Sequence, residues 1–225
     1  MKQADIRNLL GKDFLAIMRE IKKTGKAINA EEDQEQEDPL KIALLGTGSL
    51  QYFSSILSYA LQTQGVQNSI YVGTYNGLEL DIMDEQSGYH LFHPQITVIF
   101  TSYQDVRSYP EMFAEEADIA ALALAEINRY KGLWRMIYEK NGSRIFQTDF
   151  VIPVERQLGN LEASHIWSRQ SFLQLLNYTL MKEKDSYVSI LDFDYLASLA
   201  GKKKWFDFPN YYLNKCNMSY ECLPA

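Results

Sequence analysis

The stretch that decides the fold is Lys41–Leu50, which reads KIALLGTGSL. Its run Ile42–Leu45 is apolar and uncharged, as expected for a strand that is covered on both faces of a parallel sheet. Two glycines then permit a tight turn, and Ser49 falls at the N-cap of a helix predicted over Gln51–Gln64. In open α/β sheets, ligands collect at the carboxyl ends of the strands. Ser49 is therefore a candidate nucleophile, phosphate contact or simple helix cap.

Beyond this stretch, apolar strand-like runs alternate with helical patterns. The predicted strands are Lys41–Gly46, Ser69–Thr74, Ile96–Ser102, Ser143–Phe150 and Ser186–Leu191. Strands that alternate with helices indicate a parallel sheet with right-handed crossovers. We therefore predict an α/β fold: a three-layer α/β/α sandwich around a five-stranded, mainly parallel sheet of flavodoxin-like order.

The longest predicted helix has clear signals at both ends. Ser108 and Glu111 have the spacing of a capping box, with Pro110 in the first turn, so the helix is expected to begin there. Asn141-Gly142 tolerates a left-handed conformation and should close it. Near the chain's end, Asp194 is predicted to cap a short helix over Tyr195–Ala200.

The chain divides into two predicted parts. Residues 1–38 are expected to hold an amphipathic helix, with apolar positions from Ile6 to Ile21, and an acidic linker over Glu31–Asp38. Residues 39–225 are expected to form the α/β domain.

Composition excludes several functions. Hydrophobic residues make up 46% of the 225 residues, enough for a full core, and the net charge of −7 argues against nucleic acid as a partner. No apolar stretch reaches the length of a membrane span, and no signal-peptide core is present. The two cysteines, Cys216 and Cys222, are too few for a disulfide scaffold or a zinc site. We predict a cytoplasmic protein without a metal site.

Two familiar motifs are only partly present. The segment after the first strand, GTGSLQ, has Gln51 where a dinucleotide-binding loop needs its third glycine. The segment ILDFD ends in Asp192 and Asp194, like the opening of a haloacid-dehalogenase phosphatase, but only 31 residues follow Asp194 in this chain. We therefore favour neither a dinucleotide site nor phosphatase chemistry in these residues.

A serine-hydrolase arrangement is matched more closely. Ser49 stands at the nucleophile position, and Gly73, just past the second strand, could donate its N–H to an oxyanion. Near the end, Asp207 matches the acid of a D-x-x-H motif, but Asn210 replaces the histidine. Because an amide cannot accept the serine proton near neutral pH, the general-base step has no agent at that position.

Other polar residues are candidates for the same site. His165, in a loop after the fourth strand, is the weak candidate for a base, with a surface or capping role as the alternative. His90 and His93 precede the third strand and are expected to be structural. Tyr75 and Asn76, beside Ser49, either line a site or form an Asn-Gly turn.

Four segments together resemble one family, in the order KIALLGTGSL, YVGTYNGLELDIMDEQSGYHLFHPQITVIF, IPVERQLGNLEASHIWSRQSFLQLLN and ILDFDYLASLAGKKKWFDFPNYY. The carrying pieces are Tyr75, Asp84-x-x-Ser87, Phe92-x-Pro94, Leu158-Gly159-Asn160 and Gly201-x-x-x-Trp205-x-Asp207. From about Lys41 onward the chain resembles the N-terminal region of FkbH-like proteins, in which an SGNH-hydrolase-like domain precedes a phosphatase domain of haloacid-dehalogenase (HAD) subfamily IIIC.

The resemblance implies a function. The best-known members dephosphorylate bisphosphorylated glyceric acid and load the glyceryl group onto the phosphopantetheine thiol of an acyl carrier protein. That chemistry belongs to the phosphatase domain, so Mg²⁺ is expected only there and no cofactor is expected in this chain. The present chain stops about where that domain would begin.

The implied role is to bind or present an acyl, glyceryl or phosphopantetheine group to the neighbouring domain. The expected pocket residues are Ser49, Gly73, Tyr75, Asn76, Asn160 and Asp207. Two rivals stay open: a serine esterase or acyltransferase that uses Ser49 and His165, and a non-catalytic docking domain for an acyl carrier protein. Carrier proteins are commonly acidic, so the docking hypothesis needs a basic patch, for which Lys202–Lys204 is the candidate.

Overall fold

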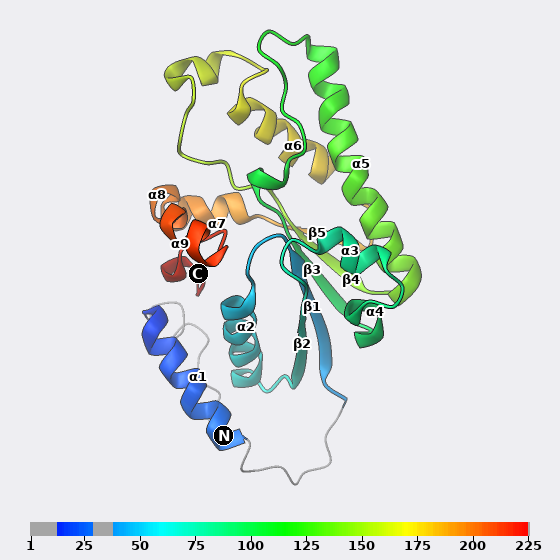
Figure 1. Ribbon diagram of the computed structural model, residues 1–225, viewed down its shortest axis with the longest axis vertical. Coiled ribbons are helices and arrows are strands. Elements are labelled where there is room, and N and C mark those ends of the chain that lie inside the picture. The colour runs from blue at the N-terminus through cyan, green and yellow to red at the C-terminus, as the bar shows by residue number, and fades with distance from the viewer. Residues whose placement is uncertain (1–12, 29–37, 225) are drawn as a thin grey trace.

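The computed structural model describes residues 13–28 and 38–224, which fold around one parallel sheet (Figure 1). Its five strands lie in the order β2-β1-β3-β4-β5, and every pairing is parallel. The strands are β1 Leu40–Gly46, β2 Asn68–Val72, β3 Ile96–Phe100, β4 Arg144–Thr148 and β5 Val188–Leu191. The predicted α/β class and flavodoxin-like order are confirmed.

Helices cover both faces of the sheet, as in a three-layer sandwich (Figure 1). The helices are α1 Phe14–Ile28, α2 Gln51–Thr63, α3 Leu78–Met83, α4 Gly88–Phe92, α5 Glu116–Asn141, α6 Arg169–Glu183, α7 Phe193–Ala200, α8 Lys202–Trp205 and α9 Phe208–Asn214. Short 3-10 turns lie at η2 Tyr103–Asp105, η3 Gly159–Ser164 and η4 Tyr220–Cys222. No helix within the described residues is long and apolar enough to cross a membrane.

The larger core lies between the sheet and α5 and α6. Trp134 and Tyr130 of α5 and Phe172 of α6 are fully buried there against strand residues such as Ile99. The Trp134 indole N–H donates to Gln147 Oε1 at 3.0 Å, so the polar edge of this large ring is satisfied inside the core.

A second core joins α1 to the domain. Ile17 of α1 is fully buried in a cluster with Ile56 of α2, Trp205 of α8 and Met218. The predicted amphipathic helix is therefore present over α1 and packs on this domain's own core, while its predicted positions Ile6–Leu10 lie outside the described residues. Most of the acidic linker also lies outside them, and the domain boundary at residue 38 stays a prediction.

The predicted start of the long helix is wrong. Residues 108–115 form a loop, and α5 begins after Glu115, which occupies the N-cap position. Tertiary contacts hold this loop open, because Tyr109 Oη donates to the carbonyl of Tyr103 at 2.5 Å and the Tyr109 ring packs against Phe172. The predicted end is confirmed, since Gly142 adopts φ +63° at the C-cap.

Two predicted caps also differ from the structure. Leu50, not Ser49, occupies the N-cap position of α2, and no side chain caps that helix. Asp192 caps α7, with its carboxylate accepting from the Tyr195 N–H at 2.8 Å. Asp194 does not cap this helix, because its carboxylate accepts from the Ile152 N–H at 2.7 Å and pairs with Lys202.

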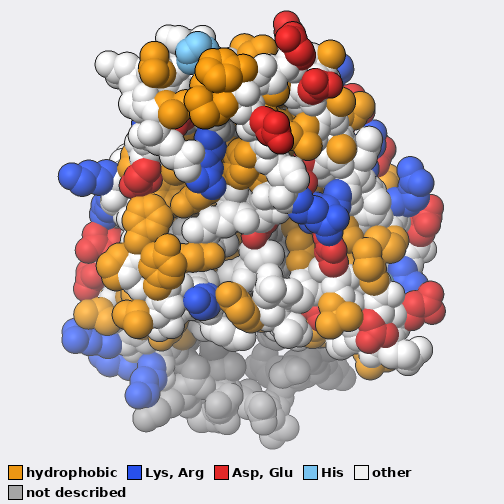
Figure 2. All heavy atoms as spheres, turned by 45° about the horizontal axis from the view of Figure 1, so that its top comes forward, with side chains coloured by type: hydrophobic (Ala, Val, Ile, Leu, Met, Phe, Trp, Pro, Cys, Tyr) orange, Lys and Arg blue, Asp and Glu red, His pale blue; other side chains and the backbone are white. Residues whose placement is uncertain are grey.

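The 108–115 loop carries an exposed apolar surface. Met112 and Phe113 are 60% and 74% exposed, and Phe113 adopts φ +67°, which is rare for a residue with a bulky side chain. The upper part of Figure 2 shows hydrophobic and acidic side chains gathered on this side of the molecule. The carboxyl ends of the strands face the same side as this loop (Figure 1).

Candidate functional site

The structure brings Ser49 together with the last segment of the chain. Ser49 follows β1 at the sheet's carboxyl edge, and its N–H donates to the carbonyl of Lys215 at 2.7 Å. The next residue, Cys216, places its sulfur 4.0 Å from the Ser49 carbonyl oxygen. Since α9 ends at Asn214, this contact docks α9, with Asp207 and Asn210, beside Ser49.

Asp207 and Asn210 are fixed by the start of α9. The Asp207 carboxylate caps this helix by accepting from the Asn210 N–H at 3.0 Å. Asn210 is buried, and its Oδ1 accepts from Asn214 Nδ2 at 2.9 Å, whereas its Nδ2 has no partner within the described residues. The position that a triad would give to histidine thus holds a buried amide with no basic atom.

The Gly73 N–H that was expected to serve an oxyanion hole, and the Ser49 N–H beside it, are both already used. The Ser49 N–H is bonded to Lys215, and the Gly73 N–H donates to the carbonyl of Leu44 at 2.8 Å, which extends the β1–β2 pairing. Gly73 is needed for packing, because a Cβ there would lie 2.8 Å from both Asp81 Oδ2 and Leu45 Cδ2. In this arrangement neither N–H is free for a developing negative charge.

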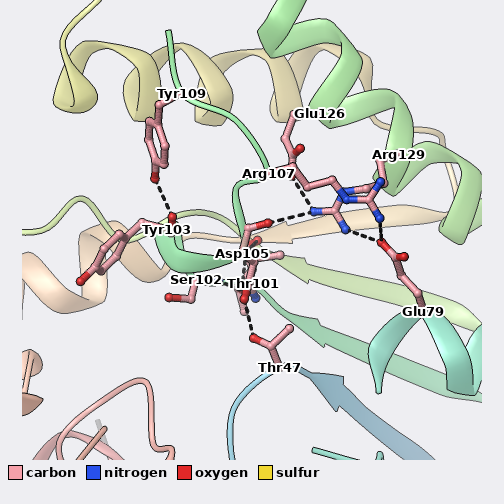
Figure 3. Close-up of polar contacts among 11 residues, drawn as sticks. Thr47, Glu79, Thr101, Ser102, Tyr103, Asp105, Arg107, Tyr109, Glu126 and Arg129 are labelled. Carbon is pink, nitrogen blue, oxygen red and sulfur yellow. Dashed lines mark hydrogen bonds and ion pairs between the residues drawn. The ribbon is translucent and has the colours of Figure 1, made fainter. Parts of the chain in front are cut away.

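A carboxylate fills the crevice between β1 and β3, where the strand order reverses. Thr47 Oγ1 donates to Asp105 Oδ1 at 2.6 Å, and the Ser102 N–H donates to Asp105 Oδ2 at 2.7 Å (Figure 3). Burial raises the pKa of Asp105, while these two hydrogen bonds and the charge of Arg129 oppose that rise. Because an internal anion takes the donors that a phosphate would need there, the geometry disfavours a dinucleotide in this crevice.

An ion-pair network supports the Asp105 loop from behind (Figure 3). Arg129 of α5 pairs with Glu126 and with Glu79 of α3, at 2.9 Å for the latter, and its Nη2 lies 3.4 Å from the Asp105 carbonyl oxygen. Arg107 also pairs with Glu79. The Arg129 and Glu126 side chains are 15% and 6% exposed, so these charges fix the loop at the site's rim.

Ser49 lines two cavities. One is a small apolar pocket of about 40 Å³, whose walls include Phe53, Phe100, Phe193 and Trp205. The other is an open groove of about 280 Å³, whose polar lining residues are Ser49, Gln51, Tyr75, Asn214 and Lys215. Gly73 also lines this groove, so three of the predicted pocket residues share it with side chains from α2 and the end of α9.

A comparison with known protein families shows which family this chain belongs to. The family described as FkbH, N-terminal domain, matches residues 41–225. The chain belongs to this family. No curated protein matches the chain.

A solved structure has the same fold. The N-terminal part of protein BF1531 from Bacteroides fragilis, described as containing a phosphatase domain complexed with Mg, superposes with a TM-score of 0.70 at 22% identity. The match covers 95% of the present chain and 54% of the other, so this chain spans about half the length of that structure. A GDP-L-fucose synthetase from Naegleria fowleri bound to NADP reaches a TM-score of only 0.36 at 13% identity, too low to carry an argument.

Not every predicted site residue of this FkbH N-terminal domain reaches the Ser49 cavities. Asn160 lies exposed in η3, and the His165 ring stacks on Trp167 at 4.6 Å, with Trp167 in turn 5.2 Å from Phe113. Neither Asn160 nor His165 lines the pocket or the groove at Ser49. The loop after β4 instead packs towards the 108–115 loop, which removes His165 from the position that a base would need.

The remaining predicted residues have simpler placements. Asn76 adopts φ +55° in an exposed turn, as its Asn-Gly sequence favours. Tyr75 is 53% exposed at the rim of the groove. His90 is buried, with Nε2 2.8 Å from the Ile82 carbonyl, which agrees with a structural role.

Sequence reasoning missed Cys216 and Lys215 as site residues. Cys216 is buried in the wall of the apolar pocket, and burial raises the pKa of its thiol, although hydrogen bonding by Tyr220 and Ser49 opposes the rise. A buried thiol with a raised pKa is a poor nucleophile near neutral pH. Across the described residues, no group of three or more His, Cys, Asp or Glu side chains is placed to hold a metal ion.

Proposed function

We propose that this FkbH N-terminal domain binds a short acyl, glyceryl or phosphopantetheine group at Ser49 and presents it to a phosphatase domain for carrier-protein loading. The observation that carries the proposal is the pair of backbone hydrogen bonds from Ser49 to Lys215 and from Gly73 to Leu44. They engage the backbone N–H groups of Ser49 and Gly73, and Ser49 lines both the pocket and the groove. Such a site favours holding a ligand over cleaving it.

The energetics favour binding over hydrolysis. Loss of one oxyanion donor costs about 10²- to 10³-fold in rate, and loss of a general base removes a further factor of about 10² to 10⁴. Here two backbone donors are engaged, and Asn210 replaces the base. The rival serine esterase would depend on His165, which stacks on Trp167 and lines neither cavity.

The pocket size favours a short group. The apolar pocket, with a cavity volume of about 40 Å³, is much smaller than the groove of about 280 Å³. A two- or three-carbon group fits this space, whereas a long fatty chain does not. The proposal therefore favours acetyl- or glyceryl-sized groups, with any longer arm in the groove.

The phosphatase domain is favoured as the neighbour, and its Mg²⁺ would belong to that domain. The structure from Bacteroides fragilis, of which the match covers 54%, is described as containing one. A carrier protein that docks on Lys202–Lys204 is less favoured, because Lys202 pairs with Asp194 and Lys204 with Glu221. Two of the three lysines are thus neutralised within the chain.

The test combines turnover and binding. We expect p-nitrophenyl acetate and acyl-thioester hydrolysis by the chain to equal that of Ser49→Ala, while calorimetry detects pantetheine or glycerate binding that Ser49→Ala weakens. Ser54→Ala, which removes an exposed hydroxyl from α2, is the matched control. Turnover that Ser49→Ala abolishes would make the esterase reading correct, and absence of any binding would refute the proposed role.

A further inference from the structure

The groove at Ser49 has an unusual charge for this protein. Among the residues that the structure describes, its lining contains no aspartate or glutamate, although the chain has 29 acidic and 22 basic residues. The polar side chains that line it can all donate a hydrogen bond: Ser49, Gln51, Tyr75, Asn214 and Lys215. A donor-rich, acid-free groove suits an anionic ligand.

Lys215 is held at this groove by its backbone. It adopts φ +59° at the C-cap of α9, where its N–H donates to Tyr211 at 2.8 Å and its carbonyl accepts from Ser49 at 2.7 Å. Its ammonium lies 5.9 Å from the centroid of the Tyr211 ring. Lys215 is half-buried, and in the described part of the chain it has no carboxylate ion-pair partner.

The lysines nearby behave differently. Lys202 and Lys204 are paired with acids, and Lys203 is exposed on α8. Partial burial of an ammonium group without an acid partner costs free energy, because part of its hydration is lost. A ligand anion in the groove would supply the missing partner.

A second groove serves as an internal comparison. It lies beside the 108–115 loop and has a volume of about 520 Å³, and its lining in the described part of the chain includes Glu111, Glu115 and Asp118 but no lysine or arginine. Figure 2 shows acidic and hydrophobic side chains gathered in that region. An anion is repelled there, so the two grooves differ in the sign of ligand that they accept.

We propose that the Ser49 groove binds a phosphate ester, whose phosphate is held by Lys215 beside the Ser49 hydroxyl. This inference rests on the proposed function and narrows it to a phosphorylated ligand. Lysine binds phosphate as a point charge, and the hydroxyl and amides of the groove add hydrogen bonds. The phosphate comes from one of two sources, the phosphopantetheine arm or a phosphorylated glyceric acid.

The experiment separates charge from shape. Calorimetry compares 4′-phosphopantetheine with pantetheine, and 3-phosphoglycerate with glycerate, so that each pair differs only by a phosphate. We expect the phosphorylated member of one pair to bind about tenfold more tightly, which corresponds to about 1.4 kcal/mol, with the ratio shrinking at high salt. The pair that shows this ratio identifies the source of the phosphate.

Variants assign the effect to Lys215. Lys215→Asn removes the charge with a residue that tolerates the left-handed conformation, so the fold should persist, and a thermal melt checks this. It should abolish the phosphate preference, whereas Lys203→Asn should keep it. Equal binding within both pairs, or a preference that survives Lys215→Asn, would overturn the phosphate inference while leaving the proposed function intact. If none of the four ligands binds, the proposed function itself fails.

Discussion

Asp149 should make the protein less stable as the pH rises from 4 to 7. It follows β4 and is 8% exposed, and its Oδ1 accepts from the N–H groups of Phe193 at 2.8 Å and Asp194 at 3.0 Å. Burial raises its pKa from 3.8 to about 6, and the negative charges of Asp192 and Asp194 add to the rise, while the two backbone hydrogen bonds oppose it. The folded state therefore favours the protonated form.

The sign and size follow from linkage. The pKa of Asp149 in the folded state lies above its unfolded value. The contribution of protonated Asp149 to the free energy of unfolding is therefore complete below about pH 4 and is lost as the pH rises through about 6. The shift from 3.8 to about 6 corresponds to roughly 3 kcal/mol at about 1.36 kcal/mol per unit. Asp149→Asn removes the charge, and since both N–H groups bind the same oxygen, the amide oxygen can accept both bonds.

Urea unfolding of the wild type and Asp149→Asn between pH 4.5 and 8 tests this reasoning. We expect Asp149→Asn to be more stable at pH 8, by up to about 3 kcal/mol, with the difference shrinking towards pH 4.5. Asp118→Asn, at an exposed aspartate of α5, should show no such convergence. Parallel curves for wild type and Asp149→Asn, or a less stable variant at pH 8, would refute the argument.

Two further predictions concern packing and backbone strain. Ile17→Ala should lower the free energy of unfolding by about 2–4 kcal/mol because Ile17 is fully buried, whereas Leu15→Ala, at a 57% exposed position of the same helix, should change it little; equal effects would show that α1 is not part of the core. Lys215→Gly should raise the free energy of unfolding by up to about 1 kcal/mol, and with it the melting temperature, because glycine adopts the left-handed conformation at φ +59° without strain. Lys203→Gly, within α8, should lower both. A less stable Lys215→Gly would contradict this.

The sheet was predictable because each strand is a short apolar run that can be recognised from the local sequence alone. Ile42–Leu45 is covered on both sides, and this burial is what its uncharged sequence indicates. The start of α5 was not predictable from Ser108–Glu111, because the contact between Tyr109 and the Tyr103 carbonyl overrides the local capping signal. Local signals failed where a tertiary contact competes with them.

For the candidate site, the sequence predicted the residues at the ends of adjacent strands but not those on the long loops. Parallel strands end at one edge, so Ser49 and Gly73 had to lie close together, and both line the same groove. Asn160 and His165 follow β4, two places from β1 in the sheet, and their long loop packs away towards Phe113. No spacing in the sequence shows where such a loop goes.

The most informative contact, from the Ser49 N–H to the Lys215 carbonyl, joins residues that no local pattern connects. It gives one physical cause for two properties of the site. It uses the Ser49 N–H, which hydrolysis would need for an oxyanion, and it fixes Lys215 at the groove, where we propose that its charge holds a phosphate. If both consequences hold, loss of catalysis and gain of anion binding are the same structural change. A variant that frees the Ser49 N–H should then also displace Lys215 and weaken binding.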